Sequence, residues 1–247
     1  MTDGSHARKH AERNLQDLDR VAEHNGAALG EAARTLIDCV EDDGLVFTAG
    51  AGHSLAGVLE SFYRAGGLAA VRPLYHPDLL PLHGAATSTA TERKRGLAGE
   101  VLREAGLRGG TDVLVVFSNS GTNPYPVELA ATARREGSEV IAVTSPAASA
   151  GAPRRTEEGT LAEQATCLLD TLVPAGDVTH PEQRPATAPG SSLANVFLWN
   201  LLMVETYERA NELGVSLPWW RSSNVPGGDE ANSGQLEHYG KRIPRLR

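Results

Sequence analysis

The stretch DVLVVFSNSGTNPYP, Asp112–Pro126, decides the fold that this chain adopts. Val113–Phe117 is an unbroken apolar run, which is typical of a strand buried on both faces of a parallel sheet. The chain then turns through the small polar residues Ser118–Asn123. Asn123 can cap a helix, and Pro124 suits its first position. The stretch therefore predicts a buried strand, a tight turn and a helix.

The turn Ser118–Asn123 has the chemistry of an anion site. At a helix N-terminus, unpaired backbone N–H groups and the positive end of the helix dipole point at one place. The hydroxyls of Ser118 and Ser120 add further donors. Ser, Asn and Gly are also common in ordinary strand-to-helix turns, so both interpretations stay open on this stretch alone.

The composition is that of an acidic globular protein. Of 247 residues, 40% are hydrophobic and 22% are charged, a typical globular balance. The formal net charge of −8 and the lack of a long basic run disfavour a nucleic-acid partner. No apolar run approaches membrane-spanning length, and the polar start MTDGSHARKH predicts no signal peptide. Cys39 and Cys167 lie far apart without metal-ligand spacing, which predicts a reducing cytoplasm.

Strand-like runs alternate with helical patterns along the chain. Besides Val113–Phe117, the predicted strands are Leu45–Thr48, Ala69–Tyr75, Glu139–Thr144 and Cys167–Leu172. The predicted helices are His6–Glu41, broken in two at Asn25-Gly26, then Leu55–Arg64, Thr91–Ala105, Val127–Arg135 and Ser191–Leu213. We expect a surface excursion over Ala147–Thr160 and a long proline-rich loop over Val173–Gly190. The alternation predicts a three-layer αβα sandwich with a five-stranded parallel sheet.

A second polar loop, Gly50–Ser54, follows the first predicted strand. Ligands of such sheets bind beyond the carboxyl ends of the strands, so we expect this loop and Ser118–Asn123 to form the site. Gly50 and Gly52 match two glycines of a dinucleotide fingerprint, but Leu55 stands where the third belongs, which disfavours a dinucleotide-dependent oxidoreductase. No serine lies in a G-x-S-x-G elbow, which disfavours a serine hydrolase.

The two loops belong to a longer set of motifs that resembles the SIS (sugar isomerase) domain. The motifs are GAGHS at 50–54, SNSG-x-N at 118–123 and VIAVTS at 140–145, with further matches at Phe62–Gly67, Asp78-Leu79, Glu92-Arg93, Ser223–Val225 and Gly227–Glu230. These further matches resemble a subfamily of stand-alone SIS proteins and extend the likeness over nearly the whole chain. The resemblance implies a flavodoxin-like, phosphosugar-binding domain at 44–214, preceded by an N-terminal helical segment at 1–43 and followed by a tail at 215–247.

Carried over by position, the resemblance implies that the two loops hold the phosphate and the sugar. The residues concerned are Gly52, Ser54, Ser118, Asn119, Ser120, Gly121, Thr122 and Asn123. Several relatives have threonine at the position of Asn123. The Asn123 amide can still donate a hydrogen bond to phosphate, so we expect this position to bind phosphate as well.

Three residues are candidates for catalysis, because isomerisation of a phosphosugar needs a group that moves a proton between adjacent carbons. Glu60 follows Ser54 on the next helix, and relatives that do chemistry carry a glutamate in a comparable place; otherwise it belongs to a solvated helix face. Glu92 matches the subfamily, and its alternative role is to complement a helix dipole. His53 can contact a sugar hydroxyl or pack under its loop. We expect no metal and no cofactor, since His76, Asp78 and His83 match no ligand spacing.

The tail after Leu217 combines two tryptophans, Trp219 and Trp220, with a polar run of turn formers. Bulky aromatic residues are depleted from disordered segments, so we expect the tail to dock. SIS proteins generally build their sites at subunit interfaces. The resemblance therefore implies a homodimer or homotetramer in which the tail helps to complete the sugar pocket, through the residues Asn224, Asp229 and Glu230.

Together, the sequence and the resemblance predict a cytoplasmic protein that binds a sugar phosphate and has an isomerase-like site. The alternative is a non-catalytic sensor that binds a sugar phosphate and signals by changing shape. The same domain also serves a sugar-phosphate etherase, so the resemblance does not select the reaction.

Overall fold

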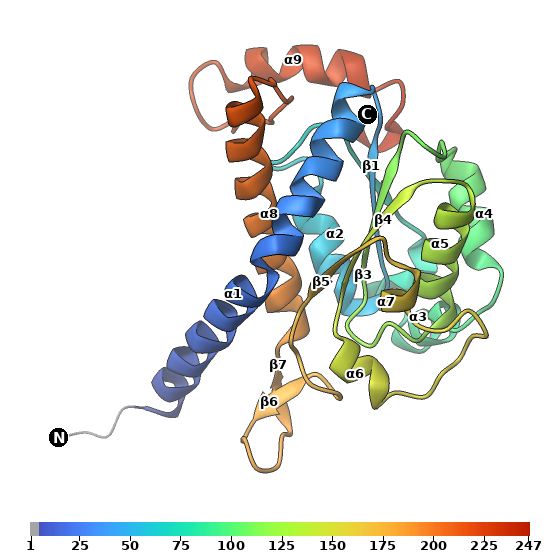
Figure 1. Cartoon of the computed structure of the whole chain (residues 1–247), viewed down its shortest axis with the longest axis vertical. Coiled ribbons are helices and arrows are strands. Elements are labelled where there is room, and N and C mark those ends of the chain that lie inside the picture. The colour runs from blue at the N-terminus through green and yellow to red at the C-terminus, as the bar shows by residue number, and fades with distance from the viewer. Residues whose placement is uncertain (1–4) are drawn as a thin grey trace.

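Five parallel strands form the central sheet of the computed structural model, which describes residues 5–247 (Figure 1). They are β1 (Val46–Gly50), β2 (Val71–Leu74), β3 (Val113–Phe117), β4 (Glu139–Thr144) and β5 (Cys167–Asp170). Their order across the sheet is β2-β1-β3-β4-β5, and each neighbouring pair is parallel. This is the predicted flavodoxin-like arrangement. All five residues of β3 are buried, as its apolar sequence requires.

Helices cover both faces of the sheet, which confirms the predicted three-layer sandwich (Figure 1). One face carries α1 (His6–Glu41), α2 (Leu55–Ser61) and α8 (Ser191–Leu213), and the other carries α4 (Leu97–Ala105), α5 (Pro124–Arg135) and α7 (Leu161–Gln164). Shorter elements follow the carboxyl ends of the strands: η1 (Gly52–Ser54), η2 (Pro77–Leu79), η3 (Pro81–His83), α3 (Ala85–Glu92) and α6 (Pro146–Ala150). The remaining elements are the hairpin β6 (Val178–His180) and β7 (Thr187–Pro189), then α9 (Gly228–Tyr239) and η4 (Pro244–Leu246).

The N-terminal helix α1 is continuous, so the predicted break at Asn25-Gly26 is wrong. The Asn25 side chain is buried and binds the edge strand β5. Its Nδ2 donates to the Asp170 carbonyl at 2.8 Å, and its Oδ1 accepts from the Asp170 N–H at 2.7 Å. These tertiary hydrogen bonds outweigh the turn preference of an Asn-Gly pair. Residues 1–4 of the predicted segment 1–43 lie outside the described residues.

Three further expectations need correction. The predicted helix Thr91–Ala105 is two helices, because Gly96 adopts a left-handed φ of 84° between α3 and α4. The proline-rich loop contains the β6–β7 hairpin, and the tail contains α9 where only turns and irregular chain were expected. In the loop and in the tail the apolar periodicity was too weak to indicate regular structure.

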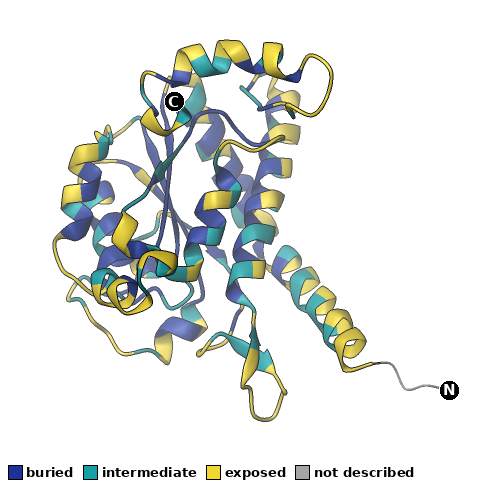
Figure 2. Ribbon diagram, turned by 180° about the vertical axis from the view of Figure 1, so that it is seen from behind, coloured by how far each residue is buried: buried dark blue, intermediate teal, exposed yellow. Residues whose placement is uncertain are grey.

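The strands β1 and β3 are paired neighbours in the sheet, although β2 lies between them in sequence, and the chain leaves them on opposite faces. From β1 the chain continues into α2 on one face, whereas from β3 it continues into α5 on the other. Figure 2 shows the buried strands running between the two helix layers. Gly57 lets α2 approach closely, since an added Cβ there would lie 2.7 Å from the Phe117 ring. A crevice for a ligand is expected where the two connections diverge.

No helix among residues 5–247 is both long enough and apolar enough to cross a membrane.

Candidate functional site

The two predicted loops start side by side at the carboxyl edge of the sheet. Gly50, the last residue of β1, is in register with Phe117, the last residue of β3. The loop Gly52–Ser54 leaves from the first strand, and Ser118–Asn123 leaves from the second. Sequence reasoning therefore placed both loops at the same edge correctly.

The loop Ser118–Asn123 forms a cradle of backbone donors at the start of α5. The Ser118 hydroxyl accepts a hydrogen bond from the Gly121 N–H at 3.3 Å and so closes the turn. Gly121 has φ 56°, and a Cβ there would lie 2.7 Å from the Thr144 hydroxyl, so only glycine fits. Within residues 5–247, the N–H groups of Ser120, Thr122 and Asn123 have no protein acceptor. Unpaired donors at a helix N-terminus are suited to an anion.

The cradle is held in place by the ends of β4 and β5. The Asn119 side-chain oxygen accepts a hydrogen bond from the Thr171 hydroxyl at 2.8 Å. The Asn119 carbonyl accepts from the Ser145 N–H at 3.1 Å, and the Ser149 hydroxyl donates to the Ser120 carbonyl at 2.7 Å. Because its oxygen is engaged, the Asn119 amide presents its NH₂ group as a free donor.

Thr171 is the residue that sequence reasoning missed. It is fully buried and lies directly after β5, 52 positions from Asn119. A single threonine after a strand carries no pattern of its own. Only the parallel pairing of β4 with β5, where Thr144 is in register with Asp170, brings it to this loop.

The first loop contributes a hydroxyl and a positive-φ glycine. Gly52 has φ 59°, and the Ser54 N–H donates to the Ala51 carbonyl at 3.1 Å. The Ser54 and Ser120 hydroxyls make no hydrogen bond within the described part of the chain, so both are available to a ligand. His53 is exposed and lines an apolar groove of about 600 Å³.

Glu92 lies at the cradle. It is the last residue of α3, and its carboxylate interacts with the side-chain amide of Asn123. Burial raises the pKa of the Glu92 carboxyl above its usual value of 4.5, and the amide of Asn123 offsets only part of this rise. A carboxylate with a raised pKa is a stronger base than an ordinary one, which suits proton transfer.

Glu60, the other predicted acid, faces α8 instead. Its carboxylate forms an ion pair with Arg64 and accepts a hydrogen bond from the Asn200 amide at 3.1 Å. The side chain is 16% exposed and lines a groove of about 460 Å³ that also includes Trp199 and Trp219. None of the residues of the two loops lines that groove. Within one chain, then, it is Glu92 that contacts the cradle.

The tail residues Asn224, Asp229 and Glu230 are exposed, and Asn224 lines a small pocket with Tyr63, Arg64 and Trp220 rather than with the two loops. The helix α9 that carries two of them lies above the amino ends of the strands (Figure 1). There Asp43, just before β1, forms an ion pair with Arg242, and the His238 ring lies 3.4 Å from the same carboxylate. These three tail side chains can therefore meet the two loops only if a second copy of the chain supplies them.

The predicted tryptophan docking has a clear structural basis. Trp220 is 3% exposed, and its N–H and carbonyl pair with Gly67 and Gly66 at 2.9 and 2.8 Å. Trp219 forms a β-bridge with Leu68, so the chain after Leu217 adds a short extended segment beside Gly66–Ala69. The tail is anchored to the body of the protein before α9 begins.

No group of three or more His, Cys, Asp or Glu side chains in the described part of the chain is placed to hold a metal ion. His76 and His83 are used locally. The His76 ring accepts a hydrogen bond from the Asp78 N–H at 3.2 Å, and the His83 ring contacts the Pro77 carbonyl at 3.1 Å.

Comparisons with a family model and with related sequences agree with one another. Residues 10–145 match the SIS domain. A UPF0309 protein of Listeria innocua is 33% identical over 232 residues, which cover 93% of this chain and 94% of the relative. A UPF0309 protein of Streptomyces coelicolor is 36% identical over 251 residues, with 98% of each chain covered.

Two solved structures share the fold. A phosphoheptose isomerase from Neisseria gonorrhoeae superposes with a TM-score of 0.55 at 19% identity, over 82% of this chain and 97% of that one. A phosphoheptose isomerase from Francisella tularensis superposes with a TM-score of 0.50 at 20% identity, over 84% of this chain and 100% of that one.

Proposed function

This chain belongs to the SIS domain family, and we propose that it binds a phosphorylated sugar between Ser118–Asn123 and Ser54. The observation that carries the proposal is the cradle itself. Among residues 5–247, the N–H groups of Ser120, Thr122 and Asn123 have no protein acceptor, the Ser54 and Ser120 hydroxyls make no hydrogen bond, and α5 begins directly after this loop. Neutral dipoles of this kind hold a phosphate without basic residues, in keeping with a net charge of −8. The likeness in fold to two phosphoheptose isomerases supports the same ligand class.

We further propose that the bound sugar phosphate undergoes aldose–ketose isomerisation, with Glu92 as the base. Its carboxylate takes the proton from the carbon next to the carbonyl, which leaves an enediolate. The resulting carboxylic acid returns that proton to the former carbonyl carbon, while a hydroxyl proton moves between the two oxygens. No electrons leave the substrate, so the reaction needs no redox partner. Contact with Asn123 and a raised pKa support this role for Glu92, and His53 is the neighbouring candidate for contact with a sugar hydroxyl.

A second candidate function, a non-catalytic sensor of the same ligand, is favoured by the surroundings of Glu60. Its carboxylate is held by the Arg64 guanidinium and by an amide, Asn200, which cannot carry a proton in a relay. If Glu92 serves only to position Asn123, the site binds a sugar phosphate without changing it.

The proposal includes a homodimer or a larger homo-oligomer. Leu59 and Leu82 are 76% and 89% exposed and line the same apolar groove as His53. Two large exposed leucines beside a groove are typical of a covered surface. The proposal assigns Asn224, Asp229 and Glu230 to a second copy, because within one chain they do not line the groove beside the two loops. The buried free thiols Cys39 and Cys167 suit a reducing cytoplasm.

The experiment that separates these functions has two steps. First, a thermal-shift screen and calorimetry compare hexose and heptose phosphates with the corresponding free sugars. Second, proton NMR in D₂O follows each bound sugar phosphate for exchange at carbon two and for conversion to its isomer. Binding with conversion supports the isomerase, whereas binding without exchange or conversion supports the sensor. A protein that binds no sugar phosphate would contradict both.

A further inference from the structure

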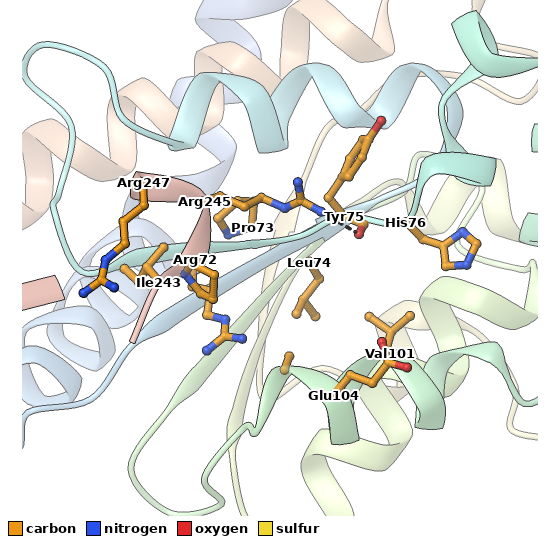
Figure 3. A pocket seen from close by; sticks show the side chains of 12 residues that line it. Arg72, Pro73, Leu74, Tyr75, His76, Val101, Glu104, Ile243, Arg245 and Arg247 are labelled. Atoms are coloured by element: carbon orange, nitrogen blue, oxygen red, sulfur yellow. Dashed lines mark hydrogen bonds between the residues drawn. The ribbon is translucent and has the colours of Figure 1, made fainter. Parts of the chain in front are cut away.

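A second polar pocket lies between the edge strand β2, helix α4 and the C-terminal segment, and three arginines line it (Figure 3). Its volume is about 440 Å³. Arg72 comes from β2, and Arg245 and Arg247 come from the segment around η4. None of the residues of the two loops lines this pocket, although Pro73, Tyr75 and Arg245 also line the apolar groove that contains Gly52 and His53.

The arginines of this pocket have no carboxylate partners. Within residues 5–247, neither Arg72 nor Arg245 nor Arg247 forms an ion pair with an acidic side chain, although the nearby Arg242 pairs with Asp43 at 2.8 Å. The only acidic side chain among the described lining residues is Glu104, on the α4 side of the pocket (Figure 3). Three guanidinium groups therefore gather against one carboxylate, in a chain whose formal net charge is −8.

Arg72 is half-buried and fixed in position. Its guanidinium lies 5.5 Å from the centre of the Phe47 ring, and its Nη1 donates to the Arg242 carbonyl at 2.6 Å. Burial lowers the pKa of the Arg72 guanidinium from its usual value. Within the described residues its Nε and Nη2 make no hydrogen bond. Asp112 offsets only part of the cost of burying this cation, so an anion at this place would be stabilising.

The opposite part of the pocket is also ordered by contacts. Ile243 is fully buried and anchors the C-terminal segment along the edge of β2. The Arg245 guanidinium lies 4.7 Å from the centre of the Tyr75 ring and donates to the Tyr75 carbonyl at 3.4 Å (Figure 3). Pro73 lacks an N–H group, so β2 offers a poor edge for pairing with another strand. The C-terminal segment therefore covers part of the sheet edge at β2.

We propose that this pocket binds a phosphorylated small molecule across the edge of β2, with Arg72 and Arg245 as phosphate donors on the two sides of the strand and with Leu74 and Val101 against its apolar part (Figure 3). Guanidinium groups bind phosphate oxygens in pairs through their planar fork of N–H donors. The buried side chains Leu74 and Val101 form an apolar wall beside the arginines. A concave pocket of this volume favours a small ligand over a nucleic acid, which the acidic chain would repel.

The test uses inorganic pyrophosphate as the probe and the full chain carrying Ser118→Ala and Ser120→Ala, which removes two hydroxyls of the cradle. Calorimetry should then show one binding event per chain. Adding Arg245→Gln should weaken this binding at least about tenfold, because one charge-assisted interaction is lost. Adding Glu104→Gln should strengthen it roughly twofold to fivefold, because a repulsive charge is removed. Arg245 is exposed, so its replacement leaves the fold intact, which the melting temperature verifies.

Arg103→Gln is the matched control. Arg103 lies next to Glu104 on α4, but its side chain turns back to the Gly99 carbonyl and does not line the pocket. Its replacement should leave pyrophosphate affinity unchanged. If pyrophosphate does not bind, or if all three single replacements have the same effect, the proposal is wrong. Binding of an acidic peptide or an oligonucleotide at Arg245 without binding of pyrophosphate would also overturn it.

Discussion

The Thr171 hydroxyl donates a 2.8 Å hydrogen bond to the side-chain oxygen of Asn119, which joins the end of β5 to the loop after β3. Thr171 is fully buried, so the bond is shielded from water. It determines which end of the Asn119 amide is left for a ligand. The carbonyl end is occupied, and the NH₂ end, which can donate to a phosphate, is free.

Thr171→Val should therefore weaken sugar-phosphate binding about threefold to tenfold, the value of one neutral hydrogen bond. Valine keeps the shape but cannot hold the amide in this orientation. Thr171→Ser, which keeps the hydroxyl, should bind nearly as the native protein does. Calorimetry on both variants, with melting temperatures as a check on folding, measures the difference. Equal affinity for the valine and serine variants would show that Thr171 does not orient Asn119.

Catalysis distinguishes the two glutamates. Glu92→Gln should slow isomerisation by at least about a hundredfold while binding changes little, because an amide cannot accept a proton. Glu60→Gln is the matched comparison, and it should retain most of the activity, since Glu60 faces Arg64 and Asn200 within its own chain. NMR rate measurements at saturating sugar phosphate give both values. The reverse order of effects would assign the base to Glu60 and imply that a second copy completes the site around it.

Glu92 should also make the free energy of unfolding depend on pH. Burial raises the pKa of Glu92 above its usual value of 4.5, so the folded state holds this proton more tightly than the unfolded state does. Stability should therefore fall as pH rises from 4.5 through the raised pKa, and the penalty is absent below 4.5. Glu92→Gln has no such proton to lose, so it should gain stability relative to the native protein as pH rises.

Urea unfolding at about pH 4 and about pH 8 measures this gain from the difference in unfolding free energy. Glu212→Gln, at an exposed position near the end of α8, is the control and should show no such change. A Glu92→Gln variant whose relative stability is the same at both pH values would contradict a raised pKa.

Assembly can be tested at the apolar groove. Leu59→Asp and Leu82→Asp each place a charge on a strongly exposed leucine, so either should convert an oligomer to single chains without loss of fold. Leu15→Asp, at a leucine of α1 that is 67% exposed and does not line the groove, should leave assembly unchanged. Light scattering gives the molar mass in each case. A native protein that is a single chain at all concentrations would exclude this interface.

Local sequence predicted the central fold well, because its signals agree with one another. The apolar run Val113–Phe117 can only be buried on both faces, and Asn123-Pro124 begins a helix where the pattern requires one. The prediction of a helix break at Asn25-Gly26 was wrong for the opposite reason. Its outcome depends on hydrogen bonds to Asp170, which lies 145 residues away and cannot be inferred from neighbouring residues.

In the candidate site, too, local features could be predicted from the sequence and long-range contacts could not. The cradle Ser118–Asn123 could be predicted because it lies in one continuous stretch. The contact of Glu92 with Asn123 and that of Thr171 with Asn119 arise from the packing of α3 and β5, so no local pattern indicated them. Sequence reasoning placed Glu60 ahead of Glu92 on the likeness to relatives, whereas the structure of one chain brings Glu92 to the loop.

The most direct test of the central claim is calorimetry of hexose and heptose phosphates on the native protein and on the Ser118→Ala/Ser120→Ala double variant. Ser120→Ala alone should weaken binding by roughly one to two decades, since one charge-assisted hydrogen bond is lost, and the double variant should weaken it further. Free sugars should bind to neither protein. If a sugar phosphate binds the double variant with native affinity, the phosphate does not lie in this cradle and the account is wrong.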